Sequence, residues 1–337
     1  MLILVCIVIF IALVFDYVNG MHDAANAIAT VVSTRVLTPG QAVMMAAVFD
    51  SLSVFLGTHV ANSIGTGIVS ADSVNEITIL AALIGAISWN VLTWWLGLPS
   101  SSSHALIGGL VGAGVAHAGL GVLIWKGLFR AVSFIVLSPL IGFFLSFCLM
   151  MAVCWVLRDF SPSSVDWFFR KAQIASACLY SLGHGSNDAQ KTAGIIALVL
   201  YRYRITTHQE AVFHVPWWLA LVCTLVIGLG TLSGGWRIVK TMGTKICKFK
   251  PVGGFCAETA GAITLLSTAL FGIPVSTTHT ITGAIIGVGA TQRLSAVRWG
   301  VAQNIVVAWV MTIPCSAVVS FVTYYAFKPL AHLLGAY

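Results

Sequence analysis

Charged residues are scarce in this sequence: they make up 8% of the 337 residues, whereas hydrophobic residues make up 58%. A soluble globular chain carries about 25% charged residues, so this chain has too few to cover a surface that faces water. The composition therefore excludes a cytosolic enzyme, a secreted disulfide scaffold and a disordered protein. No charged residue lies between Arg130 and Arg158 or between Arg298 and Lys328, and a helix needs roughly 20 apolar residues to cross a bilayer. We expect an all-α polytopic membrane protein.

Metal-binding and targeting signals are also missing. The eight cysteines contain no C-x-x-C pair, which argues against a zinc site or a redox centre, and we expect no bound cofactor. The apolar run from Leu2 to Phe15 has no Lys or Arg before it and no A-x-A cleavage site after it, so we interpret it as the first transmembrane segment. The net charge of +7 comes from cations between apolar segments, which is typical of positive-inside topology rather than of nucleic-acid binding.

Two motifs occur twice in the chain. The Gly97–His104 segment (GLPSSSSH) recurs 175 positions later as Gly272–His279 (GIPVSTTH), and Gly20–Ala24 recurs 165 positions later as Gly185–Ala189. The same order and the similar offsets indicate an internal duplication. We predict a first transmembrane repeat over residues 1–158, a short cytoplasmic linker over residues 159–171 and a second transmembrane repeat over residues 172–337.

Helix breaks and loop charges indicate that the second repeat is inverted. Each repeat is expected to hold a discontinuous helix with the Asp motif and a re-entrant helical hairpin that breaks at the G-x-P motif and returns to its starting side. Each repeat would then cross the membrane an odd number of times, so the second repeat would enter the membrane in the opposite orientation. The Arg237–Lys250 segment holds five cations, whereas its counterpart, Ala61–Glu76, holds none and carries Asp72 and Glu76. The resulting topology puts eleven cations inside, five outside and both termini outside.

Half of the acidic residues lie within otherwise apolar segments, where an ionisable group usually faces a partner or an aqueous path. They are Asp16, Asp23, Asp50, Asp188 and Glu258. Because Lys and Arg are nearly absent from these segments, we expect the carboxylates to hold a cation. The repeat-related Asp23 and Asp188 are the strongest candidates, while Asp16 would equally well anchor a helix end. Asn19, Asn26 and Asn187 add neutral oxygens, a set that suits Na⁺ and a proton equally.

Hydroxyl residues cluster directly after each G-x-P break, and each cluster precedes an expected helix. Their hydroxyls therefore lie with free backbone N–H groups at a helix N-terminus, where anions bind. Capping would explain one such cluster, but two repeat-related clusters favour an anion site. Its candidate residues are Ser101, Ser102, Ser103, Ser276, Thr277 and Thr278. His104 and His279 end the clusters, and each is as readily a hydrogen-bonding residue as a ligand. The glycines that follow allow close helix approach.

The segments Asn19–Ala27 and His184–Lys191, together with the paired G-[LI]-P-x-S-[ST]-[ST]-H motifs, resemble the PiT-type inorganic phosphate transporter family, and its bacterial low-affinity permeases in particular. This resemblance implies an inverted-repeat fold and symport of phosphate with Na⁺ or H⁺, in some relatives as a complex with a divalent metal. It implies that the hydroxyl clusters contact phosphate and that a coupling cation, with Na⁺ a candidate, binds at Asp23, Asp188, Asn26, Asn187, Asp50 and Glu258. Accessory candidates are Asn19, His22, His104, His184, Gln190, Lys191 and His279. His22 stands where relatives often have Asn, so cation ligation is expected to differ between the halves.

We therefore expect a secondary active transporter of the inner cell membrane, not an enzyme, that carries phosphate by alternating access. Cations at Asp23 and Asp188 would cancel the repulsion between carboxylates and phosphate, so that the two substrates bind interdependently. The residue patterns alone leave open sulfate or another oxyanion as substrate, an anion channel, or an intramembrane hydrolase. Phosphate and the lipid bilayer are the expected partners, nucleic acid is not, and the oligomeric state, a homodimer included, is left open.

Overall fold

The computed structural model describes residues 2–70, 73–207 and 212–333. Within these ranges the regular structure is helical, with no strand and one isolated bridge between Val69 and Leu123, which confirms the all-α prediction. Asp72, used above in the charge argument, lies outside the described residues. The α-helices are α1 (Leu2–Ser33), α2 (Pro39–Leu52), α3 (His59–Gly67), α4 (Glu76–Leu96), α5 (Ser102–Ala118), α6 (Trp125–Val156), α7 (Pro162–Thr206), α8 (Trp217–Ser233), α9 (Trp236–Lys240), α10 (Pro251–Leu270), α11 (Thr277–Gln292) and α12 (Trp299–Leu333).

Several helices are built to contact lipid. Among the described residues, α1, α2 with the turn after it, α4, α6 and α12 are long and apolar enough to cross a bilayer, and α8 with α9 and the following turn forms a sixth candidate bent by 63°. Helix α6 spans 32 residues and exposes large apolar side chains along its length, among them Phe129, Val136, Phe144 and Trp155. Because contiguous apolar surface of this kind is rare on soluble proteins, the exposed face of α6 fits a membrane environment.

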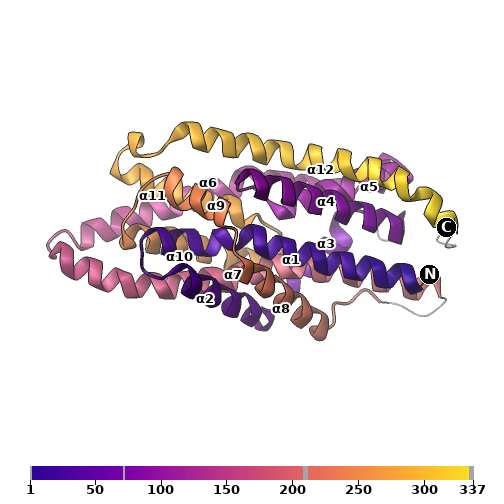
Figure 1. The fold of residues 1–337 in the computed structure, drawn as a ribbon, viewed down its shortest axis with the longest axis horizontal. Coiled ribbons are helices and arrows are strands. Elements are labelled where there is room, and N and C mark those ends of the chain that lie inside the picture. The colour runs from indigo at the N-terminus through magenta and orange to yellow at the C-terminus, as the bar shows by residue number, and fades with distance from the viewer. Residues whose placement is uncertain (1, 71–72, 208–211, 334–337) are drawn as a thin grey trace.

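The two G-x-P breaks separate α4 from α5 and α10 from α11, as predicted. Gly97 and Gly272 end the first helix of each pair with φ angles of 68° and 62°, which glycine adopts without steric cost. Distant elements bind the interrupted backbone: Thr241 Oγ1 donates to Gly97 O at 2.9 Å, and Ser63 Oγ donates to Gly272 O at 2.6 Å. Figure 1 shows α4 and α5 in the half of the molecule that holds the termini, and α10 and α11 in the other half.

The helices that carry the Asp motifs are unbroken, so the prediction of discontinuous Asp-motif helices is wrong. Helix α1 runs without interruption through Asp23, and α7 runs without interruption through Asp188. The motif glycines allow helices to cross closely instead of ending them. A Cβ at Gly20 would lie 2.1 Å from the carbonyl oxygen of Ile227, and a Cβ at Gly185 would lie 2.5 Å from that of Asp50.

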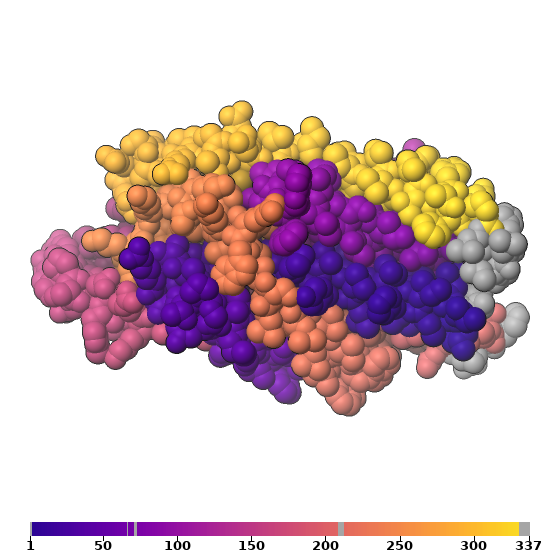
Figure 2. Space-filling model, in the orientation of Figure 1, coloured from indigo at the N-terminus to yellow at the C-terminus, as the bar shows by residue number. Residues whose placement is uncertain are grey.

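Each hairpin packs against the last helix of the other half of the chain. A Cβ at Gly112 in α5 would lie 2.0 Å from the carbonyl oxygen of Ala317 in α12, and a Cβ at Gly287 in α11 would lie 2.4 Å from that of Phe143 in α6. These contacts confirm the close helix approach predicted for the glycines after each motif. Figure 2 likewise shows α1, in indigo, beside the orange segments of the later half of the chain. The two halves are therefore interlocked.

Buried apolar side chains form two clusters with a polar layer between them. One cluster includes the buried apolar side chains between Leu4 and Phe15 of α1 and between Ala189 and Val199 of α7. The other includes those between Ala25 and Val31 of α1, together with Tyr180 of α7. The Asp motifs lie where these clusters meet. This arrangement puts the polar segments of α1 and α7 in the middle of the molecule.

Candidate functional site

The predicted site residues meet where α1 and α7 pass the N-termini of α5 and α11. Asp23 is 2% exposed and Asp188 is fully buried. The six hydroxyl residues predicted to bind an anion are at most 6% exposed. Because a buried polar group without a hydrogen-bond partner is costly, the partners of each group indicate what the site is built to hold.

Asp23 contacts residues from its own helix and from both hairpins. His22 Nδ1 lies 2.6 Å from Asp23 Oδ1. Thr278 Oγ1 donates to the same oxygen at 3.3 Å, and Ser102 Oγ donates to Oδ2 at 3.4 Å. The other ring nitrogen of His22 lies 3.1 Å from Thr93 Oγ1 in α4. Since hydrogen bonds to carboxylates are usually shorter than the two hydroxyl contacts, the oxygens of Asp23 retain the capacity to bind a further partner.

Asp188 is paired with a lysine, which corrects the expectation that the buried carboxylates lack basic partners. Lys191 Nζ donates to Asp188 Oδ1, to Ser103 Oγ and, at 2.8 Å, to the carbonyl oxygen of Val275. Thr277 Oγ1 donates to Asp188 Oδ2 at 3.0 Å. The spacing of Asp188 and Lys191 places them on one helix face, so the sequence did contain a signal for this pair.

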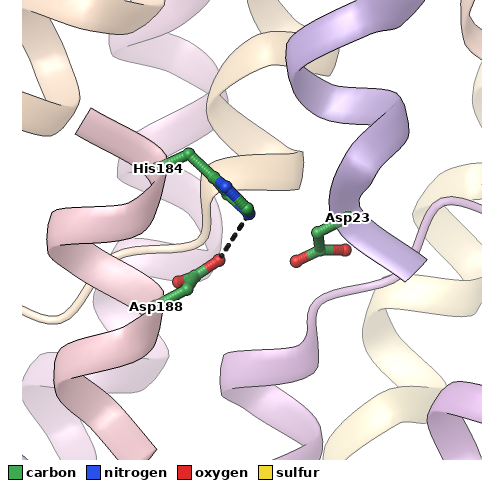
Figure 3. A group of neighbouring side chains, drawn as sticks. All are labelled: Asp23, His184 and Asp188. Carbon is green, nitrogen blue, oxygen red and sulfur yellow. Dashed lines mark ion pairs between the residues drawn. The ribbon is translucent and has the colours of Figure 1, made fainter. Parts of the chain in front are cut away.

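Asp23, His184 and Asp188 form one group in the centre of the polar layer. One ligand atom of each residue lies within 4.8 Å of the others. Figure 3 shows Asp23 on one helix facing His184 and Asp188 on another, and His184 Nε2 lies 3.3 Å from Asp188 Oδ2. The structure thus brings together the two aspartates from the two Asp motifs. Carboxylate oxygens so close to one another attract a cation.

The hydroxyl residues divide into two kinds. Ser101 and Ser276 are the N-caps of α5 and α11, and their Oγ atoms accept hydrogen bonds from the backbone N–H groups of His104 and His279, both at 3.2 Å. Capping, the alternative to anion binding, therefore describes these two serines. The other four hydroxyls, on Ser102, Ser103, Thr277 and Thr278, contact the carboxylates, Lys191 or Asn26.

His104 and His279 bring the two helix N-termini together. Their ring centroids lie 4.8 Å apart, and the His279 ring stacks on Trp309 at 3.9 Å. Among the described residues, His104 Nδ1 and His279 Nε2 have no hydrogen-bond partner. The first turns of α5 and α11 therefore face the same small region of the polar layer.

Asp50 and Glu258 occupy different places. Asp50 extends the central group, because His184 Nδ1 lies 2.9 Å from its Oδ1 and Thr231 Oγ1 donates to its Oδ2 at 2.7 Å. Glu258 forms a separate cluster, in which its two carboxylate oxygens accept hydrogen bonds from Thr30, Gln173 and Ser176. No hydrogen bond between described residues joins Glu258 directly to Asp23 or Asp188.

The amide residues beside the aspartates offer oxygens that nothing binds. Within the described part of the chain, Asn19, Asn26 and Asn187 each have a buried Oδ1 without a hydrogen-bond partner. Asn26 Nδ2 donates to Thr278 Oγ1 at 2.9 Å, so its oxygen is the free end. Gln190 is structural instead: its side chain accepts from Val60 N at 2.9 Å and thereby holds the start of α3.

The sequence did not predict some contact residues, because they lie outside the motifs. Asp16 is bound by Thr192 Oγ1 at 2.8 Å, in line with an anchoring role. Tyr180 donates its hydroxyl to the carbonyl oxygen of Thr277 at 3.0 Å. Thr231, which binds Asp50, lies in an apolar helix. Nothing in the spacing of Tyr180 or Thr231 sets them apart from residues that only pack.

Known proteins resemble the chain over most of its length. A family model described as the phosphate transporter family matches residues 19–164 and 158–320. A probable low-affinity inorganic phosphate transporter of Rhizobium meliloti is 57% identical, covering 94% of each chain, and one of Bacillus subtilis is 42% identical, covering 96% of this chain and 97% of its own. A solved structure described as "The sodium-dependent phosphate transporter" superposes with a TM-score of 0.88 at 26% identity, covering 96% of this chain and 99% of that one.

Proposed function

Because the chain belongs to the phosphate transporter family, we propose that it carries inorganic phosphate across the cell membrane together with a cation, by alternating access. It is a transporter rather than an enzyme, as its named relatives are. One observation carries the proposal: two helix N-termini that bear hydroxyls meet two buried aspartates. Ser102 of α5 contacts Asp23, and Thr277 of α11 contacts Asp188.

Phosphate would bind at the first turns of α5 and α11. The N–H groups of a first helical turn have no acceptor within the helix, and the helix dipole favours an anion there. Ser102, Thr277 and Thr278 would turn their hydroxyls from the carboxylates to the phosphate oxygens. Ser103, whose Oγ accepts from Lys191, would donate its hydroxyl to the phosphate as well. The capping serines, Ser101 and Ser276, would keep the two turns in shape. Neutral donors bind more weakly than an Arg clamp, which favours release.

The coupling cation would bind beside Asp23 and Asp188. The carboxylates would repel phosphate, and a cation between them would remove that repulsion, so each substrate would raise the affinity for the other. The unpartnered amide oxygens of Asn19 and Asn26 fit a hard cation such as Na⁺. The description of the solved relative as sodium-dependent supports Na⁺, and a proton is the alternative. A divalent metal carried with phosphate would find ligands in Asp23, His184 and Asp188.

Alternating access would require the site to open. The hydroxyl residues are almost fully buried, so phosphate enters and leaves only if the hairpins move. Each hairpin packs tightly on the last helix of the other half, with Gly112 against Ala317 and Gly287 against Phe143. We therefore expect α5 to move with α12 and α11 to move with α6, rather than one half of the chain against the other.

The membrane topology is part of the proposal. Both termini lie at one end of the molecule and the turn between α6 and α7 lies at the other (Figure 1). This supports opposite sides of the membrane for the external termini and for the cytoplasmic linker over residues 159–171, which from Pro162 onward forms the start of α7. The repeats over residues 1–158 and 172–337 would then be inverted within the inner membrane. The matching order of α4–α6 and α10–α12 supports this relation. A homodimer would contain one complete site in each chain.

Uptake of radiolabelled phosphate into proteoliposomes tests the function. Na⁺ and proton gradients are imposed separately, and sulfate and divalent metals are added as competitors. We expect phosphate to accumulate above its external concentration with one of the two gradients and to stop accumulating when that gradient is dissipated.

Other results would favour other functions. Phosphate flux that only equilibrates, with no gradient dependence, would indicate a channel. Inhibition of phosphate uptake by an equal concentration of sulfate would indicate a general oxyanion transporter, because hydroxyl and amide donors do not distinguish oxyanions by the number of protons that they carry. Release of a hydrolysis product without uptake would indicate an intramembrane hydrolase and would contradict the proposal.

A further inference from the structure

Lys191 occupies the position in the second Asp motif that Asn26 occupies in the first. Alignment of Asp23 with Asp188 pairs residues 165 positions apart, so it pairs Asn26 with Lys191. The contacts agree with this pairing. Asn26 Nδ2 donates to Thr278 Oγ1 in α11, and Lys191 Nζ donates to Ser103 Oγ in α5. Ser103 and Thr278 are themselves equivalent residues of the two hairpin motifs. The amide and the ammonium therefore lie at equivalent places in the two halves.

The surroundings of the Lys191 ammonium are those of a bound cation. Its three acceptors are a carboxylate oxygen of Asp188, the hydroxyl oxygen of Ser103 and the carbonyl oxygen of Val275. An ammonium has three N–H donors, so these three oxygens satisfy it completely. Carboxylate, hydroxyl and backbone carbonyl oxygens are also what a hard metal cation takes as ligands. Lys191 is 1% exposed, and a buried charge of this kind persists only when it is paired.

The equivalent place in the first half lacks such a fixed charge. Asn26 is neutral, and its Oδ1 and that of Asn19 are buried without a hydrogen-bond partner in the part of the chain that the structure describes. Asp23 accepts only long hydrogen bonds from Ser102 and Thr278 in addition to its contact with His22. Among the described residues, the first half therefore presents a carboxylate and two free amide oxygens, whereas the second half presents the one free amide oxygen of Asn187 and a carboxylate already neutralised by Lys191.

We infer that the ammonium of Lys191 serves as a built-in cation in the second half of the site, so that the chain takes up one coupling cation fewer per phosphate than a site with Asn in both halves. The coupling cation then binds at Asp23, Asn19 and Asn26. This inference rests on the proposed cation-coupled transport. Lys191 is a positioning residue here: it holds Asp188 and Ser103 in place and does not itself contact the phosphate.

Substitution of Lys191 by the residue found in the first half tests the inference. The charge moved per phosphate is measured in proteoliposomes, from the membrane potential that cancels net phosphate flux at fixed phosphate and cation gradients. We expect Lys191→Asn to move one more charge per phosphate than the unmodified chain, and Asn26→Lys to move one fewer. In the double variant Asn26→Lys/Lys191→Asn the ammonium changes halves, so the charge moved per phosphate should return to the value of the unmodified chain, whatever the rate of uptake.

The possible failures are distinguishable. An unchanged charge per phosphate in Lys191→Asn overturns the inference while leaving cation-coupled transport intact, because the unmodified chain is measured in the same assay. A loss of phosphate affinity at unchanged charge would mean that Lys191 binds phosphate, and this also overturns it. If Lys191→Asn folds but does not transport, equilibrium binding of ²²Na⁺ and of protons decides: one more cation bound than in the unmodified chain supports the inference, and an equal number refutes it. If Lys191→Asn does not fold, Asn26→Lys decides, and an unchanged charge in that variant overturns the inference.

Discussion

At the scale of single residues, the two aspartates should be equally necessary for transport but unequally important for folding. Asp23→Asn and Asp188→Asn are each expected to abolish phosphate uptake. The first variant loses the carboxylate that attracts the coupling cation, and the second loses the carboxylate that holds the Lys191 ammonium beside the site. Asp188→Asn also leaves the buried Lys191 ammonium without its carboxylate, and loss of one partner of a buried ion pair costs about 3–5 kcal/mol. Asp23→Asn leaves an amide that His22 can still contact, so its melting temperature should change less.

Uptake in proteoliposomes and thermal unfolding in detergent measure the two effects. Lys191→Met added to Asp188→Asn is the control, since it removes the stranded charge: it should restore the melting temperature without restoring uptake. Normal uptake in either single variant would refute the coupling role. Equal melting temperatures for the two would refute the structural ion pair. From the sequence alone both variants would be expected to fold alike, because the near absence of Lys and Arg from these segments predicts buried carboxylates without basic partners.

At the scale of helices, the contact between each hairpin and the last helix of the other half of the chain should tolerate no added atom. In Gly112→Ala the new Cβ would lie 2.0 Å from the carbonyl oxygen of Ala317, so α5 and α12 must separate. We expect a clearly lower melting temperature and slower phosphate uptake. Gly300→Ala in α12 is the control, because nothing lies within 4 Å of its Cβ. Alanine is favoured over glycine in a helix by about 1 kcal/mol, so this control should be neutral or stabilising. Equal melting temperatures for the two variants would contradict the tight packing.

Helix breaks were predictable from the sequence where glycine and proline act together. Gly97 and Gly272 have a left-handed backbone conformation and each is followed two residues later by a proline, so the helix ends there. At Gly20 and Gly185 no proline follows within the motif, and a glycine without a proline allows a neighbouring backbone to approach as readily as it allows a break. Which of the two occurs depends on Ile227 and Asp50, residues far along the chain that local patterns do not reveal.

At the scale of the whole molecule, the internal repeat indicated which motifs correspond but not how the halves fit together. Repetition predicts two similar sets of helices, and the structure shows that α5 packs on α12 and α11 on α6. Gly112 and Ala317 lie 205 positions apart and Phe143 and Gly287 lie 144 positions apart, so no local signal joins them. The same interlocking brings Asp23 and Asp188 into one polar layer between two apolar clusters. A pair of independent halves would instead have given two separate half-sites.

The proposed topology predicts labelling from opposite sides of the membrane at the two ends of α6. With the native cysteines replaced, among them the exposed Cys6, Cys148 and Cys154, single cysteines are introduced at Gly121 and Ser163. Both positions are exposed, and they flank α6, whose 32 residues span about 48 Å at 1.5 Å per residue. In intact cells an impermeant maleimide should label Gly121→Cys directly and Ser163→Cys only after permeabilisation.

The two positions are not independent, and this makes the experiment decisive. Because α6 is longer than the roughly 30 Å hydrocarbon core and exposes apolar side chains along its length, its ends must lie on opposite sides. Labelling of Gly121→Cys only after permeabilisation and of Ser163→Cys directly would invert the proposed orientation and place the five cations of Arg237–Lys250 outside, against the positive-inside rule. Labelling of both positions from one side would mean that α6 does not cross the membrane, and this would contradict the proposed topology and the proposed path for phosphate.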